Sequence, residues 1–292
     1  MSGLRIADAI DLHCHFGPDT LGGDADVETG RAVSGVDAAR EARDSGHRAL
    51  VLKSHSFASS IAAAQIEQIV PGLKVFGGIC LDHPSGGLNV AAVDAALRLG
   101  AKIVWLPTLH SHQDWLSGVG RRLGTQGQGL KVTDDAGAIK AEVNDIFELV
   151  RQHDAILATG HITADEHYAV ARAFASRGKV LVTHAGEHMA GPCLTPAQCR
   201  DLADLGATIE LTALSCNHDI CPQATRPEDM VGILRQIGTE RCTLATDYGW
   251  SDAIQHPAAA LGDFLERLWQ LGLSENELTT MVSRTPARLL AL

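Results

Sequence analysis

Short runs of apolar, often β-branched residues alternate with longer amphipathic stretches along the chain. Runs such as KVLVTH and AILATG are apolar at nearly every position, which is typical of strands buried on both faces of a sheet. The pattern predicts eight strands, at residues 9–13, 49–55, 75–82, 102–107, 156–161, 180–184, 208–214 and 243–247. Because these strands alternate strictly with helical patterns, we expect parallel pairing in an α/β protein.

The stretches between the strands have the spacing of amphipathic helices, and several end at a glycine, where helices commonly stop. Eight strand–helix units fit a single (β/α)₈ TIM barrel, a fold that typically needs ~250 residues. A doubly wound open sheet is the alternative, but the segment after the first strand, FGPDTLGGD, lacks the glycine fingerprint of that fold. We therefore expect one barrel domain over residues 1–292.

One stretch, at about residues 109–141 after the predicted fourth strand, has no clear periodicity and is rich in glycine and polar residues. A disordered linker between two domains is one interpretation. The strand and helix alternation resumes unchanged after it, which favours an insertion, and we expect a long loop over the barrel mouth. In it, Trp115, Arg121 and Arg122 either close over an anionic substrate or lie on a solvated surface.

The charge balance argues against a nucleic-acid or anionic-membrane partner. The chain has 24 Lys and Arg against 35 Asp and Glu, a net charge of −11, and no basic run longer than Arg121-Arg122. The sequence shows neither a secretory signal nor a long uninterrupted apolar stretch, and its seven cysteines are an odd number scattered through apolar sequence. We expect a cytoplasmic protein with reduced thiols and a small-molecule substrate, and the oligomeric state stays open, a homo-oligomer included.

Residue types that commonly bind metals lie at or just beyond the ends of several predicted strands. They are His13, His15, His161, His184 and Asp247. In a TIM barrel the C-terminal strand ends meet at one mouth, where active sites are built. His13 and His15 are two residues apart and therefore point to the same side of their strand. Imidazole nitrogens with one carboxylate suit Zn²⁺, whose bound water ionises near neutral pH and attacks electrophilic carbon.

This ordered set resembles the amidohydrolase superfamily of metal-dependent hydrolases, with its H-x-H on the first strand, a histidine each on the fifth and sixth, and an aspartate on the eighth. The resemblance covers nearly the whole chain, since VSRTPARLLAL at residues 282–292 is similar to the family's closing helix. The opening DLHCHFGP resembles an uncharacterised branch. The chain has no segment for the small β-sandwich of some members, so it is similar to the compact ones, which include hydrolases and metal-dependent decarboxylases.

The resemblance implies that His13, His15 and His161 are metal ligands. It implies that His184 is a ligand or an acid/base, and that Asp247 is a ligand that also takes a proton from the nucleophilic water. Buried polar residues satisfied by their neighbours are the alternative interpretation of this set.

The chain departs from many two-metal members, because the end of its predicted fourth strand reads VWLPT and offers no bridging lysine or glutamate. We therefore expect one divalent ion, with Zn²⁺ favoured; a second ion bridged by a carboxylated Lys53 is the alternative. Lys53 is otherwise expected to contact a substrate carboxylate or oxyanion. His55 and His110 are further candidates for substrate binding.

Other residues are weaker candidates. Asp82 lines the pocket or forms an ordinary turn, and Glu187 and His188 follow His184 closely enough to surround the metal. Four cysteines lack the C-x₂-C spacing of a thiolate zinc site: Cys193, Cys199, Cys216 and Cys221. His47 and His153 precede strands, at the opposite end of the barrel, and are expected to be structural or solvated.

Three functions compete. The first is hydrolysis of an amide, ester or lactone bond in a small polar substrate by a metal-activated water. The second is metal-dependent decarboxylation or hydration with the same ligands. The third is a metal-binding protein without catalysis, which would be expected to lack the aspartate at residue 247.

Overall fold

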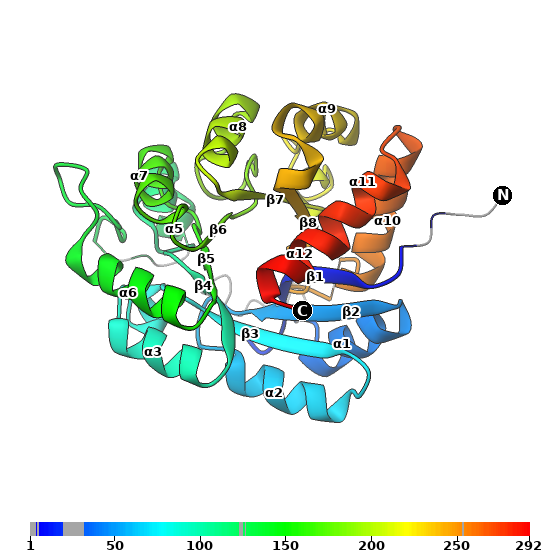
Figure 1. The fold of residues 1–292 in the computed structure, drawn as a ribbon, viewed down its shortest axis with the longest axis horizontal. Coiled ribbons are helices and arrows are strands. Elements are labelled where there is room, and N and C mark those ends of the chain that lie inside the picture. The colour runs from blue at the N-terminus through cyan, green and yellow to red at the C-terminus, as the bar shows by residue number, and fades with distance from the viewer. Residues whose placement is uncertain (1–3, 5, 20–31, 123–124, 126, 253) are drawn as a thin grey trace.

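The computed structural model describes residues 4, 6–19, 32–122, 125, 127–252 and 254–292 (Figure 1). Eight parallel strands follow one another around the sheet in chain order. They are β1 (Ala9–His15), β2 (His47–Lys53), β3 (Lys74–Cys80), β4 (Ala101–Trp105), β5 (Ile156–Ala158), β6 (Lys179–Val182), β7 (Thr208–Thr212) and β8 (Cys242–Ala245). The backbone N–H of Asp247 donates to the carbonyl of His13 at 2.8 Å, so the last strand returns to the first. The predicted (β/α)₈ barrel is confirmed.

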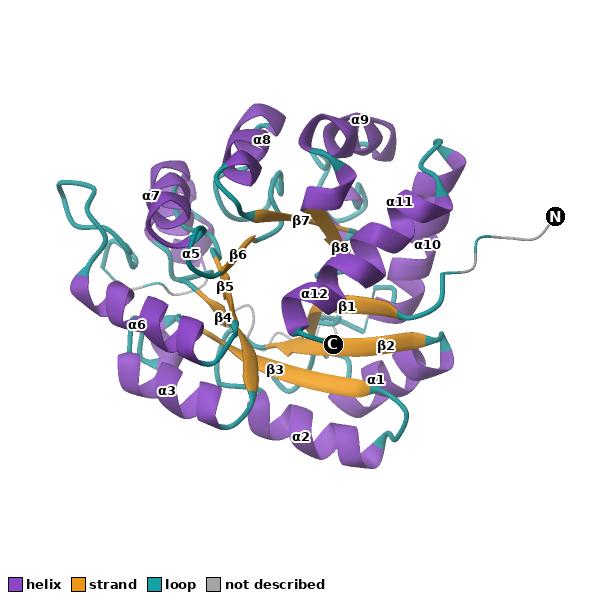
Figure 2. Cartoon of the chain, viewed as in Figure 1, coloured by secondary structure: helices purple, strands orange, loops and turns teal. Residues whose placement is uncertain are grey.

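Helices cover the outside of the sheet (Figure 2). They are α1 (Gly35–Asp44), α2 (Ser60–Ile69), α3 (Val90–Arg98), α6 (Ala141–Gln152), α7 (Ala164–Phe174), α8 (Pro196–Asp204), α9 (Pro227–Ile237) and α10 (Pro257–Gln270). Gly46, Gly100, Gly206 and Gly238 follow helices with φ between 82° and 103°, which a residue with a side chain rarely adopts. Short helices η2 (His83–Ser85), η3 (Leu214–Cys216) and η4 (Thr239–Arg241) complete the loops.

The C-terminal segment closes the N-terminal end of the barrel. It consists of α11 (Glu275–Thr279), η5 (Thr280–Arg284) and α12 (Thr285–Leu290). The hydroxyl of Thr243, near the start of β8, donates to the carbonyl of Met281 at 2.9 Å. Apolar side chains of α12 join those inside the barrel in one cluster, here called the inner core: Ile10, Leu12, Ala49, Val51, Cys80, Ile103, Trp105, Ile156, Ala158, Leu181, Ala287, Leu289 and Leu290.

A β-bulge in β1 changes which side chains face inward. Leu12 belongs to the inner core, whereas Cys14 packs in the outer layer against α1 and β2. The pairing of β1 with β2 shifts register between Asp11 and Cys14, and one Asp11 carboxylate oxygen accepts the N–H of His13 at 3.0 Å. An extra residue of this kind reverses the in–out alternation. The side chain of His13 therefore points toward the barrel interior, as that of Leu12 does.

Strands β5, β6 and β8 end two or three residues earlier than the sequence predicts. His161, His184 and Asp247 lie two or three residues beyond the ends of β5, β6 and β8. His184 has φ 27° and Asp247 has φ 62°, so the backbone leaves the extended conformation where each side chain turns toward the mouth. The prediction that these residues lie within strands is wrong, because the backbone leaves the strand conformation before it reaches them.

The segment at residues 109–141 contains more structure than the sequence predicts. It holds α4 (His112–Ser117) and α5 (Val119–Arg122), and residues 123, 124 and 126 lie outside the described part of the chain, as do 20–24 of FGPDTLGGD. Glu166, in the first turn of α7, accepts hydrogen bonds from the N–H groups of Val132 and Thr133 at 2.8 and 3.2 Å. The segment is thus fastened to the barrel.

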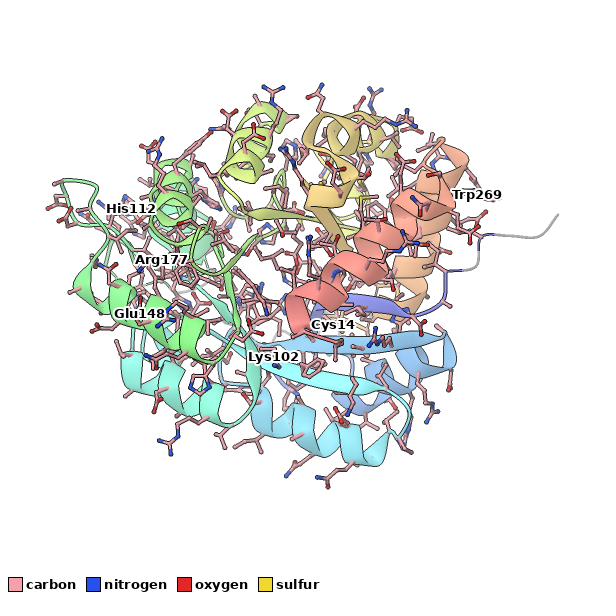
Figure 3. The ribbon with its side chains drawn as sticks, in the orientation of Figure 1. Cys14, Lys102, His112, Glu148, Arg177 and Trp269 are labelled. Atoms are coloured by element: carbon pink, nitrogen blue, oxygen red, sulfur yellow. The ribbon has the colours of Figure 1, made fainter. Side chains whose placement is uncertain are left out.

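Exposed ion pairs join neighbouring helices. Arg177 Nη1 lies 3.2 Å from Glu148 Oε1 and links α6 to the turn after α7 (Figure 3). Such exposed pairs contribute little stability. Among the described residues, no helix combines the length and the apolar character needed to cross a membrane.

Candidate metal centre

Three predicted ligands meet at the C-terminal end of β1 and β8. One ligand-type atom from each of His13, His15 and Asp247 lies within 4.8 Å of the others, and all three side chains are buried. Asp247 Oδ1 is 2.9 Å from Nε2 of His13 and 3.0 Å from Nε2 of His15. Two imidazole nitrogens and a carboxylate oxygen converge on one place, as the sequence predicts.

A carboxylate behind His13 fixes the orientation of its ring. Glu210, in the middle of β7, is fully buried, and its Oε2 lies 2.9 Å from Nδ1 of His13. The Nδ1–H donates to this carboxylate, so Nε2 is the nitrogen presented to the mouth. The same Oε2 accepts the backbone N–H of His184 at 3.1 Å, and this hydrogen bond supports the positive φ of His184.

Lys53, at the end of β2, reaches the same group. Its Nζ lies 2.8 Å from Nε2 of His13, and its side chain is among the largest fully buried ones. The ammonium also stands 5.7 Å from the ring centroid of Trp105, at the top of the inner core. The buried Lys53 side chain thus brings a cationic group next to the residues that surround Asp247 and Glu210.

Opposing charges decide the pKa values in this group. Burial and Lys53 disfavour charge on His13, but the carboxylates of Asp247 and Glu210 outweigh them and raise the pKa of His13 to about 9. Burial lowers the pKa of His15 to about 3, against the attraction of Asp247. Burial disfavours the Asp247 carboxylate, but His13 and His15 hold its pKa well below the usual range. The carboxylates of Asp247 and Glu210 are thus surrounded by groups that carry or attract positive charge.

The other two predicted ligands form a neighbouring pair. Nε2 of His184 lies 2.8 Å from Nε2 of His161, and the ring of His184 is 5.8 Å from that of His13. Burial and the neighbouring His161 hold the pKa of His184 well below its usual range. The pair adjoins the three-residue group, but its nitrogens are not part of the set within 4.8 Å.

Asp114 of α4 lies behind His161. It is fully buried; its Oδ2 is 2.6 Å from Nδ1 of His161, and its Oδ1 accepts the N–H of Gly191 at 2.8 Å. The Nδ1–H of His161 thus donates to a carboxylate, as that of His13 does. We call the following seven residues the mouth cluster: His13, His15, Lys53, His161, His184, Glu210 and Asp247.

The two weaker substrate candidates, His55 and His110, lie beside this cluster. His55 is buried and stacks on His15 with ring centroids 5.0 Å apart. His110 lies near the rim, with Nδ1 3.4 Å from Asp82 Oδ1. Asp82 is fully buried; burial disfavours its charge, but hydrogen bonds from His110 and His55 hold its pKa well below the usual range.

The remaining candidates lie farther from the cluster or form other contacts. Glu187 is buried and accepts the N–H groups of His188 and Met189, and burial raises its pKa. Arg121 lies over the ring of Trp115, 5.2 Å from its centroid. The four cysteines considered for a thiolate site form no ligand group among the described residues, in line with the sequence spacing.

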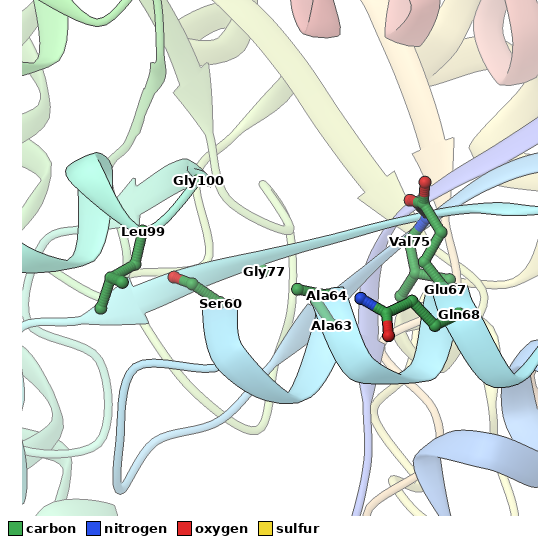
Figure 4. A pocket seen from close by; sticks show the side chains of 9 residues that line it. All are labelled: Ser60, Ala63, Ala64, Glu67, Gln68, Val75, Gly77, Leu99 and Gly100. Carbon is green, nitrogen blue, oxygen red and sulfur yellow. Dashed lines mark hydrogen bonds between the residues drawn. The ribbon is translucent and has the colours of Figure 1, made fainter.

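A cleft on the outer surface is unrelated to the mouth. Its volume is about 400 Å³, and it lies between α2, β3 and the turn after α3 (Figure 4). Small residues such as Ala63 and Gly77 line it, and Glu67, the charged residue in its lining, already accepts hydrogen bonds from Lys74 and the N–H of Val75. The cleft offers no catalytic grouping.

Sequence reasoning missed Glu210 and Asp114. Glu210 stands inside TIELT, where one charged residue in an apolar strand signals a buried partner. Asp114 lies in the stretch without periodicity, where no pattern distinguishes it from the other polar residues.

Comparison with known proteins supports the fold. The model of a family of unknown function, DUF6282, matches residues 8–210. An amidohydrolase from Pseudomonas aeruginosa is 10% identical with a TM-score of 0.61, over 97% of this chain and 95% of the other. The 2,6-dihydroxybenzoate decarboxylase from Rhizobium is 13% identical with a TM-score of 0.61, over 98% and 99%.

The chain of a third similar structure extends beyond the region that matches this one. The β-aspartyl dipeptidase from Fervidobacterium islandicum AW-1 is 15% identical with a TM-score of 0.65, over 97% of this chain and 72% of the other. No curated protein matches the sequence. These likenesses confirm the barrel fold that the resemblance to the amidohydrolase superfamily implies.

Proposed function

We propose that this chain, which belongs to the family of unknown function DUF6282, is a metal-dependent hydrolase that cleaves an amide, ester or lactone bond in a small polar substrate. The observation that carries the proposal is the buried grouping of His13, His15 and Asp247 at the C-terminal end of a TIM barrel. Active sites of this fold are built at that end. The likeness to an amidohydrolase structure supports the same assignment.

The residues present fit one divalent ion. His13, His15 and Asp247 provide two imidazole nitrogens and one carboxylate, a set that suits Zn²⁺ once the cation displaces the Nε2 proton of His13. His161 and His184 provide further imidazoles next to it. A bound divalent cation supplies Lewis acidity that lowers the pKa of water and polarises a substrate carbonyl.

The chain's own residues prepare this chemistry. Glu210 and Asp114 keep Nδ1 of His13 and His161 protonated, so Nε2 is the nitrogen of each ring that would bind a cation in place of its present contacts with Lys53 and His184. Asp247 keeps a carboxylate in the cluster that accepts a proton at Oδ1 or Oδ2. Lys53 supplies a cation for a substrate carboxylate or a developing oxyanion.

Decarboxylation is the second candidate. The 2,6-dihydroxybenzoate decarboxylase has the same fold, and the buried ammonium of Lys53 suits a substrate carboxylate. A metal-binding protein without catalysis is disfavoured, because Asp247 is present and lies within the cluster. All seven cysteines are free thiols, which supports the proposed location in the cytoplasm.

Elemental analysis and a substrate panel test the proposal together. Protein purified without chelator is expected to contain about one divalent ion per chain, and turnover of one member of a panel of lactones, amides, esters and β-keto or enoic acids is expected to vanish on chelation and return with Zn²⁺. A ratio reproducibly near two would replace the single-ion centre with one bridged through Lys53. Turnover of the acids alone would favour decarboxylation or hydration.

A further inference from the structure

A second carboxylate network lies at the mouth, beside the mouth cluster and separate from it. Asp82, just beyond β3, accepts the N–H groups of Thr108 and His110 on Oδ1, at 2.9 and 3.0 Å. Its Oδ2 accepts the hydroxyl of Thr108 and lies 3.3 Å from Nδ1 of His55. The network ties the ends of β2, β3 and β4 together with a fully buried carboxylate.

The direction of these hydrogen bonds fixes the proton on His55. Oδ1 of Asp82 accepts two backbone N–H groups, and its Oδ2 accepts the hydroxyl of Thr108, so the Thr108 proton points to Asp82. Thr108 Oγ1 lies 2.7 Å from Nδ1 of His55. Because the Thr108 hydroxyl proton is donated to Asp82, Nδ1 of His55 must carry the proton in the contact between His55 and Thr108 Oγ1. Its Nε2 then carries a lone pair.

His55 is thus oriented in the same way as two histidines of the mouth cluster, by a hydrogen bond that its Nδ1–H donates. His13 donates Nδ1–H to Glu210, and His161 donates Nδ1–H to Asp114. The ring of His55 lies between the cluster's histidines, stacked on His15 at 5.0 Å and edge-on to His161 at 6.3 Å. Its nitrogens, however, do not enter the group of ligand atoms found among the described residues.

A buried imidazole that is held by a carboxylate network but lies outside the ligand group is suited to contact the substrate. We propose that Nε2 of His55 accepts a hydrogen bond from an O–H or N–H donor of the substrate, and that Asp82 is a positioning residue that acts on Nδ1 of His55 both directly and through Thr108. The substrate class is then a small polar molecule with a hydroxyl or amide N–H next to the reacting carbon. This inference rests on the proposed function, because it assumes that the substrate binds at the mouth of the barrel.

Asp82→Asn provides a specific test, because it reverses the hydrogen-bond chain. The amide oxygen still accepts the two backbone N–H groups, but the amide nitrogen now donates to Thr108. The Thr108 hydroxyl is then free to donate to His55 Nδ1, which moves the ring proton to Nε2. Nitrogen-15 NMR of histidine-labelled, zinc-loaded full-length protein, with the His55 signals assigned by their loss in His55→Gln, is expected to show Nδ1–H in the wild type and Nε2–H in Asp82→Asn.

Two substitutions at Thr108 serve as matched controls. Thr108→Ser keeps the hydroxyl and should leave the tautomer unchanged. Thr108→Val removes the hydroxyl but leaves Asp82 as the acceptor for Nδ1–H, so the tautomer should also stay as in the wild type. An Nε2–H tautomer of His55 in the wild type, or an unchanged tautomer in Asp82→Asn, would overturn the assigned network.

Acetohydroxamic acid, a small probe with O–H and N–H donors, tests the substrate contact without turnover. Its binding to the zinc-loaded protein is expected to shift the His55 Nε2 resonance and to weaken about 10-fold in Asp82→Asn, the effect of one lost hydrogen bond. Zinc content should stay the same in Asp82→Asn and His55→Gln. Loss of zinc from His55→Gln would make His55 a ligand and refute the inference, as would an unmoved Nε2 resonance. Failure of the proposed function would show differently, as absence of bound zinc or of turnover in the wild type.

Discussion

The two ends of the barrel interior are equally buried but chemically opposite. The inner core and α12 fill the N-terminal end with apolar side chains, and its most exposed member, Ala287, exposes 8% of its surface. The mouth cluster fills the C-terminal end with imidazoles, carboxylates and an ammonium, and its most exposed member, Asp247, exposes 7%. Burial alone therefore does not distinguish a site from a core.

What distinguishes the two ends is the demand for partners. An apolar side chain needs only volume around it, whereas a buried imidazole or carboxylate loses free energy unless it is hydrogen-bonded or paired. At the mouth each oriented histidine has its own carboxylate, such as Glu210 for His13 and Asp114 for His161. Substitutions at the inner core should consequently reduce stability, and substitutions at the mouth should reduce chemistry.

Asp247→Asn should produce the largest effect. It removes the charge and most of the basicity but keeps the shape, and asparagine tolerates the left-handed φ of 62° that this position requires. Loss of a general base typically costs ~10²–10⁴ in rate, so kcat/KM on the active substrate of the panel should fall by about that factor. The melting temperature should remain within a few degrees of the wild type.

His153→Asn is the control for this experiment. His153 is exposed at the end of α6, and the variant should turn over at nearly the wild-type rate. If Asp247→Asn keeps its rate within a few-fold of the wild type, Asp247 is not the base, and the division of labour between the two ends does not hold.

Leu290→Ala should have the next largest effect, at the opposite end. Leu290 is 2% exposed within the inner core, and truncation of such a leucine destabilises by about 2–5 kcal/mol. Denaturant unfolding measures this loss, and metal content and kcat/KM at a temperature where the variant is folded should stay close to wild type. Leu292→Ala, at a position 38% exposed, should change stability by less than about 0.5 kcal/mol. A loss of metal in Leu290→Ala would show that the two ends are not independent.

The sequence predicts the barrel well because the signal is repeated eight times. Each unit gives an apolar run followed by an amphipathic stretch, so an error in one boundary leaves the topology unchanged. It also predicts the grouping of His13, His15 and Asp247, because strand ends in this fold converge wherever the individual strands stop.

The sequence does not predict how these side chains are oriented. At the bulge between Asp11 and Cys14, the Asp11 carboxylate accepts the N–H of Thr246, the residue after β8 and more than 230 positions away. Asp114 approaches His161 only because the segment after β4 folds back over the mouth. Such long-range pairings leave no periodic trace in the chain, and the supporting carboxylates were therefore missed.

His47 should give the smallest effect and extends the comparison to pH. It lies at the start of β2, at the end of the barrel away from the mouth, and burial lowers its pKa to about 4. Since the pKa of an unfolded histidine is about 6.5, unfolded chains bind the proton first as pH falls, and the folded state loses stability between pH 6.5 and 4 but not above. Replacing His47 with glutamine removes this loss, which for a partly exposed group is on the order of 1 kcal/mol.

Urea unfolding of chelator-treated protein from pH 7.5 to 4.5 should show a shallower decline in the free energy of unfolding for His47→Gln than for the wild type. His153→Gln, at an exposed position, should follow the wild type. Parallel curves for His47→Gln and the wild type would mean that His47 contributes nothing to the acid sensitivity of the fold.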